Sequence, residues 1–248
     1  MDTISFVARA GNRILNLVVS IFVVVALSYS GYVLWDTYNV YRGAFLNTDL
    51  LQFKPSGMLG EDNPTLEELM AINEDVLGWI VIDDTHIDYP IVRGKDDMEY
   101  VNKDVYGEFS LSGAIFLAAQ NERDFSDRYN LIYGHHMDNG GMFGDIMEFL
   151  DEKYFNDHKT GMLYLTDTTY RIELWACIET DAYDENIFAV NNKNTEAEIA
   201  DFIDYVENNA LHIREDMGVT TSDRLVAMST CVNAATNGRA IMIGRIVS

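Results

Sequence analysis

The residues best suited to covalent chemistry are a cysteine, a histidine pair and an arginine. Cys231 ends the apolar run RLVAMSTC, where a predicted strand gives way to a loop, and Arg239 follows beyond the Asn237-Gly238 turn. A thiol attacks well only as a thiolate, which needs a cationic neighbour or a base. If the two strands pair across this loop, Arg239 comes beside Cys231 and can stabilise both a thiolate and a developing oxyanion.

On spacing alone, each of these residues also has an inert interpretation. Cys231 can be a small buried residue, and Arg239 a solvated charge on an edge strand. Arg245 lies on the same predicted strand, where alternation places both arginines on one face, and closeness to the turn favours Arg239. The other cysteine, Cys177, lies in the apolar run YRIELWACIET, which favours a buried structural thiol, although counting alone also allows one disulfide.

The chain has five histidines, and two of them are adjacent. His135 and His136 end the predicted strand NLIYGHH, so we expect their side chains to point to opposite faces, one of them toward a cleft. Adjacent strand residues diverge, and no Cys-x-x-Cys or His-x-x-x-His spacing accompanies them, so no metal is expected. His86, His158 and His212 are expected to be solvated surface residues.

Short strands in hairpins, with helices between them, must position these residues. The runs GWIVIDD and HIDYPIVRG predict one hairpin, GMLYLTDTTYRIELWACIET a second, and RLVAMSTC with RAIMIGRIV a third, while GAIFLAA and NLIYGHH are typical of buried strands. Helices are predicted at NPTLEELMAIN, with Asn63 as cap and Pro64 at the first position, at GMFGDIMEFLDEKYF, and at TEAEIADFIDYVENNAL, which opens with a Thr195 to Glu198 capping box. This pattern predicts a mainly β domain, a barrel or a sandwich with peripheral helices.

The N-terminal segment predicts a membrane anchor. Residues Ile14 to Trp35 carry no charge, and their number matches the roughly 20 residues that a helix needs to cross a bilayer. Arg9 and Arg13 precede the segment and Arg42 is the first basic residue after it, so the positive-inside bias predicts a cytoplasmic N-terminus. A cleaved signal peptide is the alternative, but its apolar region is usually about 7 to 15 residues long, which favours an uncleaved signal anchor.

Composition narrows the class of protein. The 248 residues include 40 acidic and 17 basic ones, a net charge of -23, which argues against nucleic acid as a partner because phosphate binding needs clustered Lys and Arg. A hydrophobic content of 48% is enough for a core and excludes a disordered chain. Two cysteines do not make a disulfide scaffold.

Three blocks carry a resemblance to a known family. VLGWIVIDDTHIDYPIVRGKDDMEYVNKD, GAIFLAAQNERDFSDRYNLIYGHHMDNGGMFGDI and MSTCVNAATNGRAIMIGRIV resemble a class B sortase, a membrane-anchored cysteine transpeptidase of Gram-positive bacteria. The resemblance implies a sortase-like closed β-barrel with peripheral helices, preceded by one transmembrane helix. It also implies four parts: a cytoplasmic N-terminus (1–13), a signal anchor (14–35), a juxtamembrane helix and loop (36–62), and an extracellular catalytic domain (63–248).

The resemblance assigns three catalytic roles. The nucleophile falls on Cys231, the histidine after Tyr-Gly is His135 rather than His136, and the arginine at the start of the last strand is Arg239. These residues agree with the chemistry expected from their types and spacing.

The five residues that end in the nucleophile differ from the family signature in two places. The signature is of the type Thr-Leu-x-Thr-Cys, and here Ala227 and Met228 replace its first two residues, which removes one hydroxyl and keeps a similar apolar volume. Ser229 and Thr230 flank the nucleophile and are candidate substrate contacts, although strand packing is the favoured role for Thr230.

The implied activity is the cleavage of a C-terminal sorting motif of a secreted protein after its Thr, through a thioacyl intermediate on Cys231. The acyl group then passes to a peptidoglycan peptide amine, and no cofactor is expected. A pilin-polymerising sortase and a hydrolytic cysteine protease are the enzyme alternatives. A membrane-anchored surface receptor with an inert Cys231 is the non-enzyme alternative.

Overall fold

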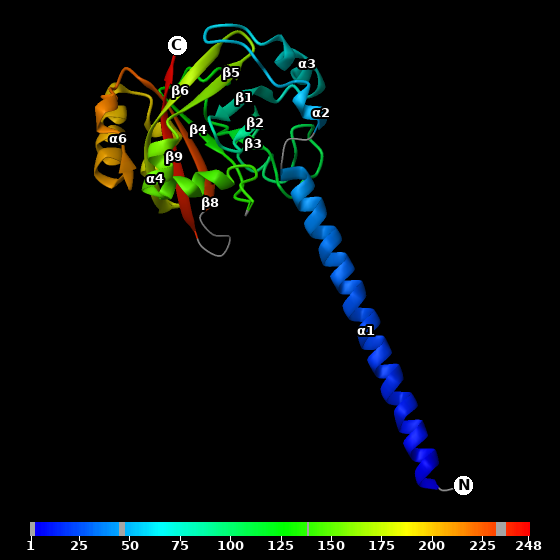
Figure 1. Ribbon diagram of the computed structural model, residues 1–248. Helices are drawn as coiled ribbons and strands as arrows, with labels where there is room; N and C mark the ends of the chain where they lie inside the picture. The colour runs from blue at the N-terminus through cyan, green and yellow to red at the C-terminus, as the bar shows by residue number, and fades with distance from the viewer. Residues whose placement is uncertain (1–2, 45–47, 138, 232–236) are drawn as a thin grey trace. The chain divides into compact units, whose positions relative to one another are not determined.

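The computed structural model describes residues 3–44, 48–137, 139–231 and 237–248 (Figure 1). Contacts divide the chain into two compact units, one that ends at Arg42 and one that begins at Gly43. The first unit contains helix α1 (Thr3–Ala44) except its last two residues. Within α1 the stretch Arg9–Tyr38 has a mean hydropathy of 2.2, and its most apolar part is not buried. This helix is long and apolar enough to cross a membrane, a property that signal sequences share.

The second unit contains the strands and the remaining helices. In chain order they are α2 (Thr48–Leu51), α3 (Pro64–Ile72), β1 (Val76–Ile82), β2 (Asp88–Val92), β3 (Ile115–Leu117), β4 (Tyr129–Tyr133), the 3-10 helix η1 (Gly144–Leu150), α4 (Glu152–Asp157), β5 (Thr160–Leu165), β6 (Thr169–Asp181), α5 (Glu185–Phe188), the 3-10 helix η2 (Val190–Asn192), α6 (Glu196–Asn209), β7 (His212–Ile213), the 3-10 helix η3 (Glu215–Met217), β8 (Arg224–Cys231) and β9 (Gly238–Val247).

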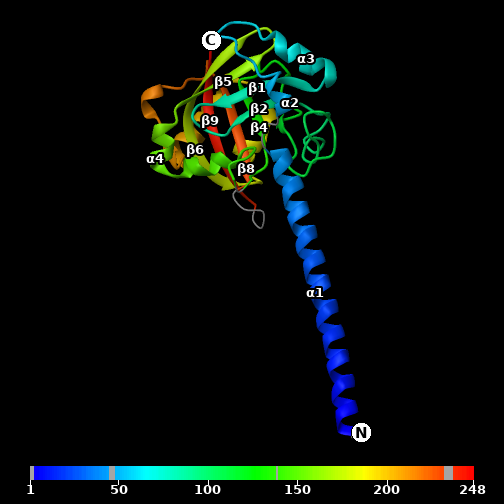
Figure 2. The same ribbon diagram turned by 45° about the vertical axis from the view of Figure 1, so that its right-hand side comes forward.

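The strands close into a barrel. In the part of the chain that the structure describes, the sheet order is β5-β1-β2-β3-β4-β8-β9-β6-β7, and an additional pairing between β5 and β6 joins the two sides of the sheet (Figure 2). The predicted pairs β1–β2, β5–β6 and β8–β9 are antiparallel neighbours, so all three predicted hairpin pairings are confirmed. The pairs β2–β3 and β4–β8 are parallel. Parallel pairing with β8 places the end of β4, just before His135, beside the end of the cysteine strand.

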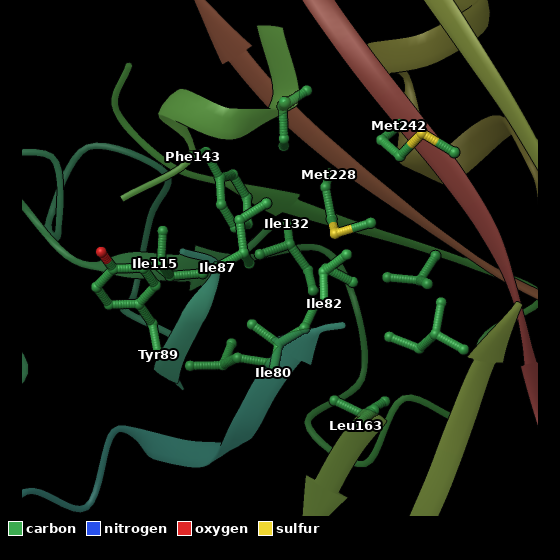
Figure 3. Packing of buried hydrophobic residues seen from close by; sticks show 14 of the residues in the cluster. Ile80, Ile82, Ile87, Tyr89, Ile115, Ile132, Phe143, Leu163, Met228 and Met242 are labelled. Atoms are coloured by element: carbon green, nitrogen blue, oxygen red, sulfur yellow. The ribbon is translucent and has the colours of Figure 1, made fainter. Parts of the chain in front are cut away.

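Alternation along the strands separates two apolar faces. Val226 and Met228 of β8 belong to the cluster inside the barrel, whereas Leu225 and Ala227 pack on the outer face. Met228 stands opposite Met242 of β9 in the ladder, and both are fully buried among isoleucines of β1, β3 and β4 (Figure 3). Burial of a side chain of this size contributes about 1.5 to 3 kcal/mol, so the inner cluster fixes the register that positions the site.

Two helices cover the outside of the barrel. Helix α6 packs Ile199, Phe202 and Val206 against the outer face of β6, β8 and β9, and Figure 1 places it beside these strands. The predicted capping box at its start is confirmed, because the Thr195 side chain accepts from the Glu198 N–H and the Glu198 carboxylate accepts from the Thr195 N–H. Helix α3 packs on the other side, against β1 to β3.

Two local predictions are wrong. The single helix predicted over GMFGDIMEFLDEKYF is divided into η1 and α4, because the Asp151 side chain accepts from the Tyr154 N–H at 2.9 Å and starts a new helix. Asn63 precedes Pro64 at the start of α3, as expected, but its side chain makes no cap. Its amide instead donates to the Leu165 carbonyl and to Thr169 Oγ1, both at 2.8 Å, and so fastens α3 to the β5–β6 turn.

Candidate active site

A pocket of about 350 Å³ lies at the C-terminal ends of β4, β6 and β8 and at the start of β9. Its described lining consists of Asp97, Met98, Val101, Phe116, Tyr133, Gly134, His135, Ala182, Phe188, Ser229, Thr230 and Arg239. Four residues singled out from the sequence, namely His135, Ser229, Thr230 and Arg239, therefore meet at one pocket. Strand ends are where a rigid barrel can present reactive groups to a substrate.

Cys231 is the last residue of β8, and its Cα partner in the ladder is Arg239 of β9. The expectation that the two strands pair across the intervening turn is thus confirmed for the backbone. The side chain of Cys231 and the loop at 232–236 lie outside the described residues. Ser229, two positions before Cys231 on the same strand, pairs with Ile241 and is 2% exposed.

Thr230 is also buried, with 2% of its surface exposed. Its hydroxyl oxygen Oγ1 has no hydrogen-bond partner in the described part of the chain. A buried hydroxyl without a partner costs free energy, so the position favours a donor or acceptor that arrives from outside, such as a bound substrate.

His135 follows the end of β4 and is half-buried at the pocket wall. Its backbone is held on both sides, because the Gly134 N–H donates to the Ser229 carbonyl at 3.1 Å and the Phe143 N–H donates to the His135 carbonyl at 3.0 Å. The ring atom Nε2 lies 2.7 Å from the Val101 carbonyl oxygen. The histidine is therefore tied to β8, to Phe143 and to the loop before β3.

The prediction that the histidine pair ends a strand is wrong. The ladder between β4 and β8 stops at Tyr133 and Ser229, and His136 then forms an isolated bridge with Met142. The segment turns back on itself at this point, which removes the alternation that was expected to separate the pair. His135, and not His136, is among the described residues that line the pocket.

The remaining histidines have other surroundings. His86 is exposed, as expected, and its Nδ1 lies 3.0 Å from Asp145 Oδ2. The expectation of solvated residues is wrong for His158 and His212, which are half-buried. The His158 ring stacks on Tyr154 with 3.8 Å between centroids, and His212 Nε2 lies 2.9 Å from the carbonyl oxygen of Leu150. The His212 contact ties the 150–158 region to β7.

Arg239 is half-buried, and its Nη1 donates to the Gly238 carbonyl at 3.1 Å. The charge of Arg239 affects the pKa of the neighbouring Tyr133. Burial raises this pKa far above its ordinary value, the Asp97 carboxylate raises it further, and the positive charge of Arg239 lowers it. The Tyr133 hydroxyl stays protonated at neutral pH, as that of an ordinary tyrosine does, and Tyr133 is among the residues that line the pocket.

The alternatives left by the sequence differ in their partners. Arg245 Nη2 is paired with Glu173 Oε2 at 2.7 Å, near the other end of β9 from the pocket. Cys177 is fully buried inside the barrel, which raises the pKa of its thiol to about 12, so the prediction of a structural thiol is confirmed. Arg245 is engaged by a carboxylate and is therefore poorly suited to stabilise a thiolate, and Cys177, which stays a thiol, is a poor nucleophile.

Several lining residues were not found from the sequence. Asp97 and Met98 lie in the polar run GKDDMEY, which is typical of a solvated loop, and Asp97 accepts from the Ala119 N–H at 2.7 Å. Phe188 ends the four-residue helix α5 and stacks on Tyr133 with ring centroids 6.3 Å apart. Tyr133 alone carried a signal, since it precedes Gly134 and His135 in the Tyr-Gly-His sequence.

Comparisons with known proteins place the chain in a family. No family model matches it. Sortase B of Listeria monocytogenes is 31% identical over 192 residues, which cover 76% of each chain. A Streptococcus pyogenes class B sortase involved in pilus biogenesis has a crystal structure that is 41% identical, with a TM-score of 0.67, and covers 73% of this chain and 97% of its own. The Staphylococcus aureus sortase B–substrate complex is 26% identical, with a TM-score of 0.68, over 76% of this chain and 87% of its own.

A closed barrel of this topology, with these similarities over most of the chain, defines a sortase, which is a cysteine transpeptidase. The chain belongs to the sortase B family.

Proposed function

We propose that Cys231 is the nucleophile and that it attacks the carbonyl of a Thr in a C-terminal sorting motif of a secreted protein. The observation that carries this proposal is the register of the last two strands, which sets Cys231 opposite Arg239 at a pocket also lined by His135. Attack by the thiolate on the Thr carbonyl carbon forms a tetrahedral intermediate. Its collapse breaks the C–N bond, so the nitrogen leaves with the C-terminal part of the motif and a thioester to the Cys231 sulfur remains.

Arg239 supplies the positive charge that this attack needs. A guanidinium stays charged at every pH at which a protein is active, so it can stabilise both the thiolate and the oxyanion of the tetrahedral intermediate. The apolar lining from Met98, Val101 and Phe188 accepts the uncharged residues of the motif, and the protonated Tyr133 hydroxyl offers it a donor. Ser229 and Thr230 are proposed as further substrate contacts at the strand end.

His135 transfers the proton in both halves of the reaction. As an imidazolium it protonates the departing amine, and as a neutral imidazole it takes a proton from the amine that attacks the thioester. An attacking amine gives transpeptidation, whereas water gives hydrolysis. The second substrate is therefore the partner that distinguishes this enzyme from a cysteine protease.

The acceptor is a primary amine at the cell surface, and we propose a peptidoglycan peptide amine. A lysine of a pilin subunit is the second candidate, favoured by the 41% identity to a class B sortase involved in pilus biogenesis, against 31% to Listeria sortase B. Both acceptors are amines, so the same three catalytic groups serve either one.

The N-terminal helix is proposed to anchor the enzyme on the outer side of the membrane. Arg9 and Arg13 precede its apolar stretch, which by the positive-inside bias keeps the N-terminus in the cytoplasm. The division is then a cytoplasmic segment (1–13), an anchor (14–35), a juxtamembrane segment (36–62) and an extracellular catalytic domain (63–248). A catalytic domain placed outside meets both the secreted protein and the cell-wall amine.

The test is an acyl-transfer assay with the full chain in detergent and a library of sorting peptides. Products are read by mass spectrometry with water alone, with a peptidoglycan cross-bridge peptide, or with a lysine peptide from a pilin as acceptor. We expect cleavage after Thr and incorporation of one of the two amines. Release of the free acid alone, in the presence of either amine, contradicts the transpeptidase assignment, and incorporation of the pilin lysine alone replaces the first acceptor with the second.

A further inference from the structure

The His135 ring lies against two backbone segments of the loop between β2 and β3. Its Nε2 atom is 2.7 Å from the carbonyl oxygen of Val101. On the ring edge next to that nitrogen, Gly113 comes so close that a Cβ atom at its position would lie 2.9 Å from His135 Cδ2. The loop closes here, because the Ala114 N–H donates to the Tyr100 carbonyl at 3.1 Å.

The backbone at Gly113 allows no side chain. Its φ angle of +61° is in the left-handed region that residues with a Cβ rarely adopt. A Cβ would also lie 2.5 Å from the Val101 carbonyl oxygen and 2.9 Å from that of Tyr100, closer than real contacts permit. The carbonyl that meets the histidine ring can therefore keep its position only while residue 113 is glycine.

The contact with Val101 selects one tautomer of the ring. A carbonyl oxygen can only accept a hydrogen bond, so Nε2 must carry the proton that is donated to it. In the neutral imidazole Nδ1 then carries the lone pair. Which nitrogen of a catalytic histidine is protonated is set in this way by the partner of the other nitrogen.

We propose that Gly113 and the Val101 carbonyl form a clamp that holds His135 with Nε2–H bonded to the protein, so that Nδ1 is the nitrogen that transfers the proton. This inference rests on the proposed role of His135. Gly113 is a positioning residue, because it acts on the reaction only through the histidine ring.

The proton balance follows from this assignment. In the first half-reaction the imidazolium gives its Nδ1 proton to the departing nitrogen, which also takes the electron pair of the broken C–N bond. The neutral ring that remains is the Nε2–H tautomer. In the second half-reaction the Nδ1 lone pair accepts a proton from the attacking amine as the new C–N bond forms and the thiolate leaves.

The first experiment reads the tautomer directly in the full chain in detergent. Nitrogen-15 NMR of histidine-labelled protein is recorded at a pH where the imidazoles are neutral, and His135→Gln identifies the resonances of His135. The expected result is a protonated Nε2 and an unprotonated Nδ1. A neutral His135 with its proton mainly on Nδ1 overturns the clamp, even if Gly113→Ala fails to fold.

The second experiment compares Gly113→Ala with Gly107→Ala, a matched control in the same loop. Gly107 also has a positive φ, +81°, but a Cβ there would meet no atom within 4 Å. Both variants introduce backbone strain, and only Gly113→Ala moves the carbonyl against the ring. We expect kcat to fall about 100-fold in Gly113→Ala with KM near that of the wild type, together with a change in the His135 tautomer signals. Gly107→Ala should change neither quantity by more than about twofold.

Equal kcat values and equal His135 signals in the two glycine variants overturn the proposal. Failure of the clamp is distinguishable from failure of the proposed function. If His135→Ala keeps full transpeptidase activity, the catalytic role of His135 is wrong. If His135→Ala is inactive while the neutral ring is protonated on Nδ1, only the clamp is wrong.

Discussion

Lys193 is a buried cation whose replacement should stabilise the protein at neutral pH. The residue is 3% exposed and lies between η2 and the start of α6. Its Nζ donates to the Ala189 carbonyl at 2.9 Å and lies 4.9 Å from the centroid of the Tyr129 ring and 5.3 Å from that of Phe202. Burial lowers the pKa of Lys193 from its usual 10.5 to about 8, although Asp184 and Glu198 oppose this shift.

The lowered pKa of Lys193 gives both the sign and the size of the effect on the free energy of unfolding. Because the folded state gives up the Lys193 proton more readily than the unfolded state, unfolding takes up a proton between about pH 8 and pH 10.5. Stability therefore rises with pH in this window. A lowering from 10.5 to about 8 corresponds to about 3 kcal/mol at about 1.4 kcal/mol per pH unit. This penalty is complete below about pH 8 and absent above about pH 10.5.

Lys193→Met keeps the length of the side chain and removes the charge. At pH 7 it should remove the penalty of about 3 kcal/mol and lose about 1 kcal/mol for the Ala189 carbonyl left without this donor, a net gain of about 2 kcal/mol. Near pH 10.5 only the lost hydrogen bond is left, so the variant should be less stable than the wild type by about 1 kcal/mol.

The assay is urea unfolding of wild type and variant at several values from pH 7 to pH 10.5. Subtracting the free energy of unfolding of the wild type from that of the variant at each pH removes the contributions of the other groups that titrate in this range. Lys153→Met is the matched control, because Lys153 is exposed and its ion pair with Asp157 raises the pKa of the lysine above its usual 10.5, so its difference should stay constant up to about pH 10.5. A Lys193→Met difference that does not change with pH, or a loss of stability at pH 7, refutes the reasoning.

Three further predictions concern single side chains. Thr230→Val, which keeps the shape and removes a buried hydroxyl without a partner in the described chain, should raise the free energy of unfolding by about 1 kcal/mol and lower kcat/KM about tenfold; unchanged kcat/KM assigns Thr230 to strand packing alone. Cys177, with a thiol pKa of about 12 caused by burial, should react with iodoacetamide at pH 8 about 1,000-fold more slowly in the folded than in the unfolded protein, and equal rates contradict its burial. Asn63→Asp and Asn63→Ala should each lower the free energy of unfolding by about 1 to 3 kcal/mol in urea, because both lose the amide that donates to Leu165 and Thr169; an Asn63→Asp variant as stable as the wild type identifies a simple helix cap instead.

Much of the scaffold was predictable because its determinants are local. The run RLVAMSTC matches β8, and the alternation of inner and outer residues along that strand follows the period of two. The capping box at Thr195 involves residues three positions apart. The expectation that Arg239 comes to the same end of the sheet as Cys231 also rested on local features, the two strand patterns and the Asn237-Gly238 turn signal between them.

The errors arose where distant contacts decide the structure. Asn63 has the type and position of a helix cap, but its partners Leu165 and Thr169 are about a hundred positions away in the chain. Gly144, the first residue of η1, packs against the backbone of residue 137, where a Cβ would lie 2.4 Å from the carbonyl oxygen of Met137. No periodicity in the sequence reports contacts of this kind.

The residues of the pocket also divide into those that the local sequence identified and those that it did not. His135 and Arg239 were identified by chemistry and by resemblance, and both line it. Asp97 was not, because a carboxylate in a polar run is typical of a solvated loop, and its bond to the Ala119 N–H joins residues 22 positions apart in the chain. Phe188 was missed because a four-residue helix has too little periodicity to reveal a buried face.

The most direct test of the account is the mass spectrum of the enzyme trapped with a sorting peptide. The full chain is mixed with the peptide without an amine acceptor, quenched in acid and digested. We predict an acyl group, added with loss of the C-terminal part of the motif, on the peptide that contains Cys231, in wild type and in Cys177→Ala but not in Cys231→Ala. Cleavage of the sorting peptide by Cys231→Ala, or an adduct on another residue, contradicts the assignment of the nucleophile.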